Sequence, residues 1–281
     1  MSAGVALRAG ERRVWLKWHQ LRRAAGDPAH ERANLQQGIA RGASLEVDLV
    51  LTRDGHFVCL HDDELAAETT GEGLVREHDR AAIERLRQRD HQRRPLATPP
   101  LFLDEVVDAL AGAPEGWPGR LQLDLKPPWA PFEGSVIERF AGLTAPVAQH
   151  LMLGGTRWPP VLSLGRAVRG LRLGFDPLDL HEVAPPASTA EFTALGAYTL
   201  AHAYEARIFH FHIPLLLRGL AQRVDLIALA QARGAEVDAW RLEPGHDRAA
   251  AQLVRLVEAG VDQITTDSPE ALERLWQTRQ A

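Results

Sequence analysis

The chain has 281 residues, of which 45% are hydrophobic and 25% charged, a composition that excludes a disordered or collagen-like protein. Its 37 acidic and 32 basic residues leave a formal charge of −5, which disfavours a nucleic-acid binder, because such proteins present a basic stripe. Apolar runs are interrupted well before the roughly 18 residues of a membrane span. Residues 1–13 carry charges in place of the apolar stretch of a secretory signal. The single cysteine, Cys59, cannot form an internal disulfide, so we expect a cytoplasmic protein.

Short apolar runs alternate with amphipathic stretches along the whole chain, an order that predicts a parallel sheet with helices between its strands. Strands are predicted near 13–20, 44–51, 119–126, 149–154, 171–176, 206–213, 235–242 and 262–266. Helices are predicted at 28–42, 102–112, 132–143, 158–169, 188–203, 215–233, 246–259 and 268–279. Eight strands are the number that closes a barrel, so the expected fold is α/β, a (β/α)8 TIM barrel.

Capping signals mark several of these helices. A cap residue followed by a first-turn proline, at Asp27-Pro28 and at Ser268-Pro269, predicts the starts of the first and last helices. Gly42, Gly234 and Gly260 follow helical stretches, where a left-handed C-terminal cap favours glycine.

One segment, from about residue 62 to 100, does not fit the alternation. It is polar, and it follows a hairpin signal at Asp54-Gly55. A structureless loop of this length is unusual, so we expect a short helix around 80–89. The predicted organisation is one barrel domain over 1–281 with an inserted subdomain after the second strand, at about 62–100.

Carboxylates lie at alternate positions of two predicted strands. In a strand, residues two apart share a face, so Glu46 and Asp48 point to the barrel axis while the leucines and valines between them face the helices. The same alternation in 120–126 places Asp124 and Lys126 on the inner face. A single carboxylate at a strand end is usually a solvated terminus, but three from two strands favour a site. Burying several like charges needs a counterion, and an all-oxygen ligand set favours Mg²⁺ or Ca²⁺ over Zn²⁺.

Two histidines end neighbouring apolar runs, His19 near the end of the first predicted strand and His61 after the hairpin. A lone histidine more often satisfies a hydrogen bond in the core. Here both are candidates for the mouth that holds the carboxylates. His210 and His212 also share a strand face, an arrangement that is more often structural.

The sequence from Leu45 to Asp62 resembles the signature of the glycerophosphodiester phosphodiesterases. It has their Glu-x-Asp, Thr-x-Asp-Gly and His-Asp blocks, at 46–48, 52–55 and 61–62, in matching order and spacing. The resemblance continues in blocks at 70–73, 100–106, 123–126, 237–240 and 260–269. Between residues 140 and 230 no motif matches, and the resemblance there rests only on the alternation of predicted strands and helices.

This resemblance implies a TIM barrel that cleaves phosphodiesters with a divalent metal. Glu46 and Asp48 match the first two metal ligands, and Asp124 takes the third position, usually Glu. His61 matches one of the paired catalytic histidines, and His19, 27 residues before Glu46, stands where the other belongs. The resemblance also makes Lys126 and Trp240 candidates for contacts with substrate.

Three departures from the family pattern concern the substrate. Gln20-Leu21 replaces the usual Arg-Gly and removes a guanidinium that would contact phosphate; Pro28-Ala29-His30-Glu31 replaces a Glu-Asn-Thr block. Arg241-Leu242-Glu243 follows Trp240 in place of Thr-Val-Asn. Arg241 and Arg157 are candidate replacements for the missing phosphate contact. Asp in place of the third Glu also occurs in the related sphingomyelinase D-like enzymes.

The predicted reaction is hydrolysis of a glycerophosphodiester to an alcohol and glycerol 3-phosphate, with His61 as the general acid and His19 as the base. The roles of the two histidines could be reversed. Two alternatives stay open: phospholipase D-like cleavage of an intact lipid headgroup, and a non-catalytic barrel that binds a metal or phosphoester. The expected partner is a small diester or a lipid headgroup, with no nucleic acid and no transmembrane segment; the oligomeric state is not predicted.

Overall fold

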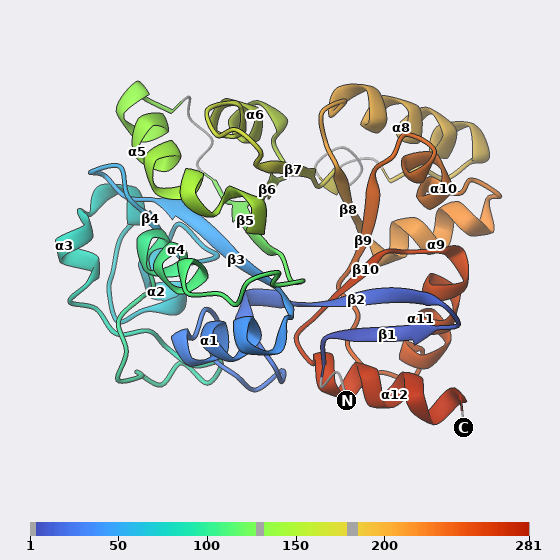
Figure 1. Cartoon of the computed structure of the whole chain (residues 1–281), viewed down its shortest axis with the longest axis horizontal. Coiled ribbons are helices and arrows are strands. Elements are labelled where there is room, and N and C mark those ends of the chain that lie inside the picture. The colour runs from blue at the N-terminus through green and yellow to red at the C-terminus, as the bar shows by residue number, and fades with distance from the viewer. Residues whose placement is uncertain (1–3, 128–131, 179–184, 281) are drawn as a thin grey trace.

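Eight parallel strands form a closed barrel in the computed structural model, which describes residues 4–127, 132–178 and 185–280 (Figure 1). The barrel strands are β2 (Arg12–Trp18), β3 (Ser44–Leu51), β5 (Leu121–Leu125), β6 (Leu151–Gly155), β7 (Arg172–Phe175), β8 (Ile208–His212), β9 (Glu236–Trp240) and β10 (Gln263–Thr266). Strand β2 pairs with both β10 and β3, which closes the ring. Each predicted strand overlaps one of these, so the predicted TIM barrel is confirmed.

Helices lie on the outside of the barrel (Figure 1). They cover the buried leucines and valines that face away from the barrel axis. They are α1 (Arg32–Arg41), α4 (Leu103–Ala111), α5 (Gly134–Thr144), α6 (Trp158–Arg166), α8 (Thr189–His202), α9 (Ile213–Ala221), α10 (Leu226–Gln231), α11 (Ala249–Ala259) and α12 (Pro269–Gln280). Gly42, Gly234 and Gly260 follow their helices with positive φ, as predicted. None of the described helices has both the length and the apolar character needed to span a membrane.

Two predictions for helices around the barrel were wrong in detail. The first helix begins at Arg32, because His30 has a φ of 53° and Glu31 is extended; Asp27 instead accepts hydrogen bonds from the backbone of the preceding turn. The stretch predicted as one helix over 215–233 forms two, α9 and α10. Asp225 caps the second by accepting hydrogen bonds from the N–H groups of Ile227 and Ala228.

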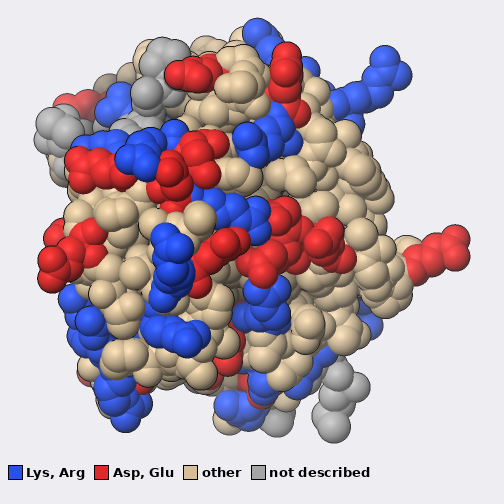
Figure 2. Space-filling model, turned by 90° about the vertical axis from the view of Figure 1, so that its left-hand side faces the viewer, with Lys and Arg blue, Asp and Glu red and all other residues tan. Residues whose placement is uncertain are grey.

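The segment between β3 and α4 contains the predicted insertion. Strand β4 (Phe57–Val58) turns back antiparallel to β3, through a turn in which Gly55 has a φ of 78°. Helices α2 (Leu65–Glu68) and α3 (Arg80–Ile83) follow, so the helix predicted at 80–89 is shorter than expected. Val50, Val58, Leu60, Leu65, Val75, Ile83 and Phe102 form an apolar cluster separate from the main core. Basic and acidic side chains are interspersed on this side of the molecule, without a continuous basic stripe (Figure 2).

Strand β1 (Ala6–Ala9) pairs antiparallel with the beginning of β2 and lies beside α12 (Figure 1). The N–H of Gly4 donates to Glu273 Oε2 (2.6 Å), and Trp276 Nε1 donates to the carbonyl of Arg8 (2.7 Å). These contacts join the two ends of the described chain near the start of β2. The polar residues considered below lie toward the opposite, carboxyl ends of the strands.

Candidate active site

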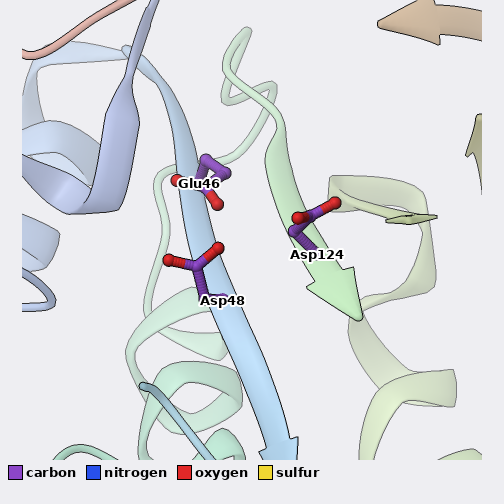
Figure 3. A group of neighbouring side chains, drawn as sticks. All are labelled: Glu46, Asp48 and Asp124. Carbon is purple, nitrogen blue, oxygen red and sulfur yellow. The ribbon is translucent and has the colours of Figure 1, made fainter. Parts of the chain in front are cut away.

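Three carboxylates converge between β3 and β5. Asp48 pairs in register with Asp124, and Glu46 lies two residues before Asp48 on the same face of β3. One ligand oxygen from each of the three lies within 4.8 Å of the others, and Figure 3 shows their side chains gathered between the two strands. Glu46 and Asp48 are buried, while Asp124 is partly exposed. The alternation seen in the sequence therefore places the three predicted ligands together.

Lys126 is the cation of this cluster. Its Nζ lies 2.9 Å from Asp48 Oδ1 and 2.6 Å from Asp124 Oδ2. Burial would raise the pKa of Asp48, but Lys126 holds that pKa well below its usual range. Burial, together with the charges of Asp48 and Asp124, raises the pKa of Glu46 well above its usual range. One ammonium among three carboxylates leaves two negative charges when all are ionised.

Two residues from the segments that depart from the family pattern, Gln20 and His30, contact these carboxylates. Gln20 has a φ of 51°; its N–H donates to Glu46 Oε2 (2.6 Å), and its side-chain amide donates to Asp48 Oδ2 (2.7 Å). The backbone N–H of Asp48 donates to His30 Nε2 (3.2 Å). At the position where the family pattern has arginine, this chain thus has the amide of Gln20, which binds the carboxylate of Asp48.

His19 follows β2 directly, in the short 3₁₀ segment His19–Leu21. Its Nδ1 lies 2.6 Å from Asp267 Oδ1, which follows β10. Burial lowers the pKa of His19, although Asp267 opposes that shift. Because the ionised carboxylate can only accept, Nδ1 carries the proton and Nε2 has a free lone pair. Arg241 Nη1 lies 3.4 Å from the other oxygen of Asp267.

Asp267 is a site residue that the sequence reasoning missed. The sequence comparison includes Asp267 only within the matching block at 260–269. Its position at the carboxyl end of the last strand indicates a site residue, because the active sites of such barrels lie at that end.

His61 lies in the loop after β4. Its side chain is 46% exposed, and its Nδ1 lies 3.1 Å from Asp62 Oδ1. Its backbone N–H donates to Glu68 Oε2 (2.6 Å), so the start of the insertion fixes the loop that carries this histidine.

A cavity of about 160 Å³ joins these groups at the carboxyl ends of the strands. It is lined by six of the seven predicted site residues, namely His19, Glu46, His61, Asp124, Lys126 and Trp240. Asp48, the seventh, is fully buried behind them. Trp240 lies against the ring of His212, with centroids 4.8 Å apart. Arg157 and Arg241 are not among the described lining residues.

A second polar cluster lies deeper in the barrel, around Asp238. Lys17 Nζ donates to Asp238 Oδ2 (2.7 Å), Thr265 Oγ1 donates to the same carboxylate (2.8 Å), and His210 Nδ1 lies 2.9 Å from it. Burial would raise the pKa of Asp238, but Lys17 and His210 hold it below its usual range. Lys17 also donates to the side chain of Gln122.

The first cluster suits a divalent cation. Its donors are hard carboxylate oxygens, which Mg²⁺ and Ca²⁺ prefer, and the two negative charges left when all three carboxylates are ionised equal the charge of one such ion. Asp48 Oδ1 is buried and has no hydrogen-bond partner in the described part of the chain, apart from the ion-pair contact with Lys126. Mg²⁺ and Ca²⁺ fit this donor set equally well.

Comparison with known proteins gives matches of two kinds. The sequence model of the glycerophosphoryl diester phosphodiesterase family matches residues 32–116. A probable glycerophosphodiester phosphodiesterase 1 of Mycobacterium tuberculosis (strain ATCC 25618 / H37Rv) is 45% identical over 53 residues, which are 18% of this chain and 19% of that protein. The sequence match thus spans about a fifth of the curated relative.

Solved structures resemble nearly the whole barrel. A putative glycerophosphoryl diester phosphodiesterase from Silicibacter pomeroyi DSS-3 has a TM-score of 0.73 at 22% identity, over 97% of this chain and 96% of that one. A putative enzyme of the same name from Agrobacterium tumefaciens str. C58 has a TM-score of 0.70 at 20% identity, with 95% and 98% coverage. An Oleispira antarctica phosphodiesterase, solved in complex with the product sn-glycerol-3-phosphate, has a TM-score of 0.66 at 20% identity, with 93% and 96% coverage.

The predicted resemblance to the glycerophosphodiester phosphodiesterases is therefore confirmed, by sequence within residues 32–116 and by fold over almost the entire chain.

Proposed function

We propose that this chain is a phosphodiesterase that hydrolyses glycerophosphodiesters to an alcohol and glycerol 3-phosphate. One observation carries the proposal: three carboxylates gathered around the single ammonium of Lys126 lie at the cavity that two histidines also line. The family match over residues 32–116 and the fold of structures that bear this enzyme's name support it.

Glu46, Asp48 and Asp124 would hold the divalent cation, Mg²⁺ or Ca²⁺. When bound, such an ion supplies positive charge to a nonbridging phosphate oxygen. Asp124 and Asp48 raise the pKa of Lys126 well above its usual range, although burial opposes this shift. Lys126 therefore stays protonated and would offer the phosphate a second positive contact.

The two histidines would divide the proton transfers. His19 is neutral at pH 7 because burial lowers its pKa, and Asp267 orients its ring so that Nε2 can take a proton from the attacking hydroxyl, which would be the substrate hydroxyl next to the phosphoester. Its attack would release the alcohol and form a cyclic phosphate, and water would then open that ring to give glycerol 3-phosphate. His61, at the exposed edge of the cavity, would donate a proton to the leaving alkoxide. This assignment keeps the roles predicted from the sequence.

The inserted segment at 62–100 would serve the site by holding the loop of His61, through the contact with Glu68. We propose that it is a subdomain of a single barrel domain. The cytoplasm is the compartment we propose, because the buried, free thiol of Cys59 suits a reducing environment.

The test is a substrate panel of soluble diesters and intact lipids, measured with Mg²⁺, with Ca²⁺ and with EDTA. Release of glycerol 3-phosphate from glycerophosphocholine, abolished by EDTA and restored by metal, is the expected result. Activity confined to micellar lipid would instead indicate a phospholipase D-like enzyme. Metal binding with no turnover of either class would indicate a non-catalytic barrel, and both outcomes would overturn the proposal.

A further inference from the structure

The side of the cavity away from the carboxylates has a different chemistry. It is built by β6, β7 and β8, where Gly154 and Gly174 take positions that face the barrel axis. A Cβ on Gly174 would lie only 2.6 Å from His210 Nε2, and one on Gly154 would lie 3.6 Å from the same atom. The absence of a side chain at Gly174 therefore makes room for the His210 ring, which packs against the backbone of β7 on this side of the barrel.

Polar atoms without partners point to a ligand here. His210, Thr156 and Trp240 line the same cavity, and each has a buried polar atom, Nε2, Oγ1 and Nε1 respectively, with no hydrogen-bond partner in the described part of the chain. The His210 side chain is only 3% exposed. Buried polar atoms are usually paired, because leaving one unsatisfied costs about 1–3 kcal/mol. Three such atoms around one cavity are best explained by a bound group that supplies their partners.

The chemistry of these atoms indicates which group that is. His210 Nδ1 faces the Asp238 carboxylate, so Nδ1 carries the proton and Nε2 accepts. The indole of Trp240 can only donate, and the hydroxyl of Thr156 does both. Asp176, two residues after Gly174, also lines the cavity, and its backbone-bound carboxylate adds acceptor capacity. Hydroxyl groups, each of which donates and accepts, match this mixture.

The charges on this side argue against an anion as the ligand. Lys17 is the nearest cation of the inner cluster, and its ammonium is already bonded to Asp238 and Gln122. Lys126 faces the carboxylates of the metal cluster instead. A phosphate would therefore bind near Lys126, and a neutral polyol arm attached to it would extend toward β6–β8.

We propose that Thr156, Asp176 and His210 form a hydroxyl-binding subsite, with Trp240 as a further donor, which holds the polyol arm of the phosphodiester. The proposal rests on the proposed phosphodiesterase function and adds a basis for selecting the glycerol moiety. An apolar lipid arm at this place would leave the buried polar atoms unpaired.

The experiment compares glycerophosphocholine with an analogue in which propane-1,2-diol replaces glycerol. The analogue keeps the hydroxyl adjacent to the phosphoester and lacks the terminal hydroxyl, so the availability of a neighbouring nucleophile does not change. The wild type should have a kcat/KM about 10–100-fold lower for the analogue, the loss expected when a buried polar group is left unpaired. Thr156→Val and His210→Phe should reduce this preference at least several-fold, mainly by slowing turnover of glycerophosphocholine.

Thr199→Val is the matched control, because Thr199 in α8 also has a buried hydroxyl without a hydrogen-bond partner but does not line the cavity. It should retain the wild-type preference. Equal kcat/KM values of the wild type for the two diesters, or an unchanged preference in both cavity variants, would overturn the subsite.

A wild type that hydrolyses neither diester would refute the proposed function separately. The subsite is then tested by ligand binding. The measured quantity is the rise in the protein's melting temperature, compared between glycerol 3-phosphate and propane-1,2-diol 1-phosphate. A larger rise with glycerol 3-phosphate, lost in Thr156→Val and kept in Thr199→Val, would support the subsite. Equal rises in the wild type would overturn it.

Discussion

Two buried polar clusters share the interior of this barrel, and they differ in how their charge is compensated. Asp238 is one carboxylate surrounded by Lys17, Thr265 and His210, all within 2.9 Å. Glu46, Asp48 and Asp124 are three carboxylates around the single ammonium of Lys126. Burial alone therefore does not distinguish structure from function here. The charge of Asp238 is compensated by its protein neighbours, whereas the other cluster has more carboxylates than cations and suits a positively charged ligand.

Replacing Glu46 by Gln should produce the largest effect on activity and show that the carboxylate cluster of Glu46, Asp48 and Asp124 is not needed for folding. Loss of a metal ligand removes several kcal/mol of transition-state stabilisation, so kcat/KM should fall by about 10³ or more. In EDTA the free energy of unfolding should stay equal or rise, because the change removes a buried like charge beside Asp48. Activity assays and urea denaturation measure the two quantities.

The matched control is Glu258→Gln on the exposed face of α11, which should change neither activity nor stability. A marked loss of metal-free stability in Glu46→Gln would mean that both clusters support the fold, and the contrast between them would disappear.

Replacing Lys17 by Met should show the opposite behaviour. The side chains of Lys17 and Asp238 are 4% and 0% exposed, so removing the ammonium leaves a buried carboxylate without its main compensating charge. Breaking a buried pair in this way costs about 3–5 kcal/mol of unfolding free energy. The double variant Lys17→Met, Asp238→Asn should recover much of that loss in urea denaturation. A single variant as stable as the wild type would refute a structural role for this cluster.

The sequence predicted the fold and the convergence of the three carboxylates for the same reason. In β3 and β5, apolar and acidic residues alternate with the period of a strand, and parallel strands bring such residues to one end of a barrel. The Asp238 network was not predicted, because Lys17, His210 and Asp238 come from distant strands and each alone is consistent with ordinary packing. The contacts of Gln20 depend on a positive φ that no local pattern indicates in a glutamine.

Replacing each histidine by Ala should test the division of labour at the cavity. A proton-transfer group contributes about 10²-fold or more, so His19→Ala and His61→Ala should each lower kcat by at least that factor. Neither residue belongs to the compensated cluster, so the urea midpoints should change little. The corresponding control is His150→Ala, because the ring of His150 packs against Trp117 and does not line the cavity. Wild-type turnover in both cavity variants would remove the histidines from the mechanism.

The pH dependence of kcat/KM should reveal how the environment of His19 differs from water. A general base must be neutral, and burial lowers the pKa of His19, so the acidic limb of the profile should lie below pH 6.5 and activity should rise as pH rises through it. Asp267 favours the protonated ring, so Asp267→Asn should move that limb lower still, by about one pH unit or more. Its plateau rate should also fall, because the ring loses the carboxylate that orients it. Asp108→Asn, on the exposed side of α4, should leave the profile unchanged. A limb that moves to higher pH in Asp267→Asn would show that His19 is not the base whose ionisation the profile reports.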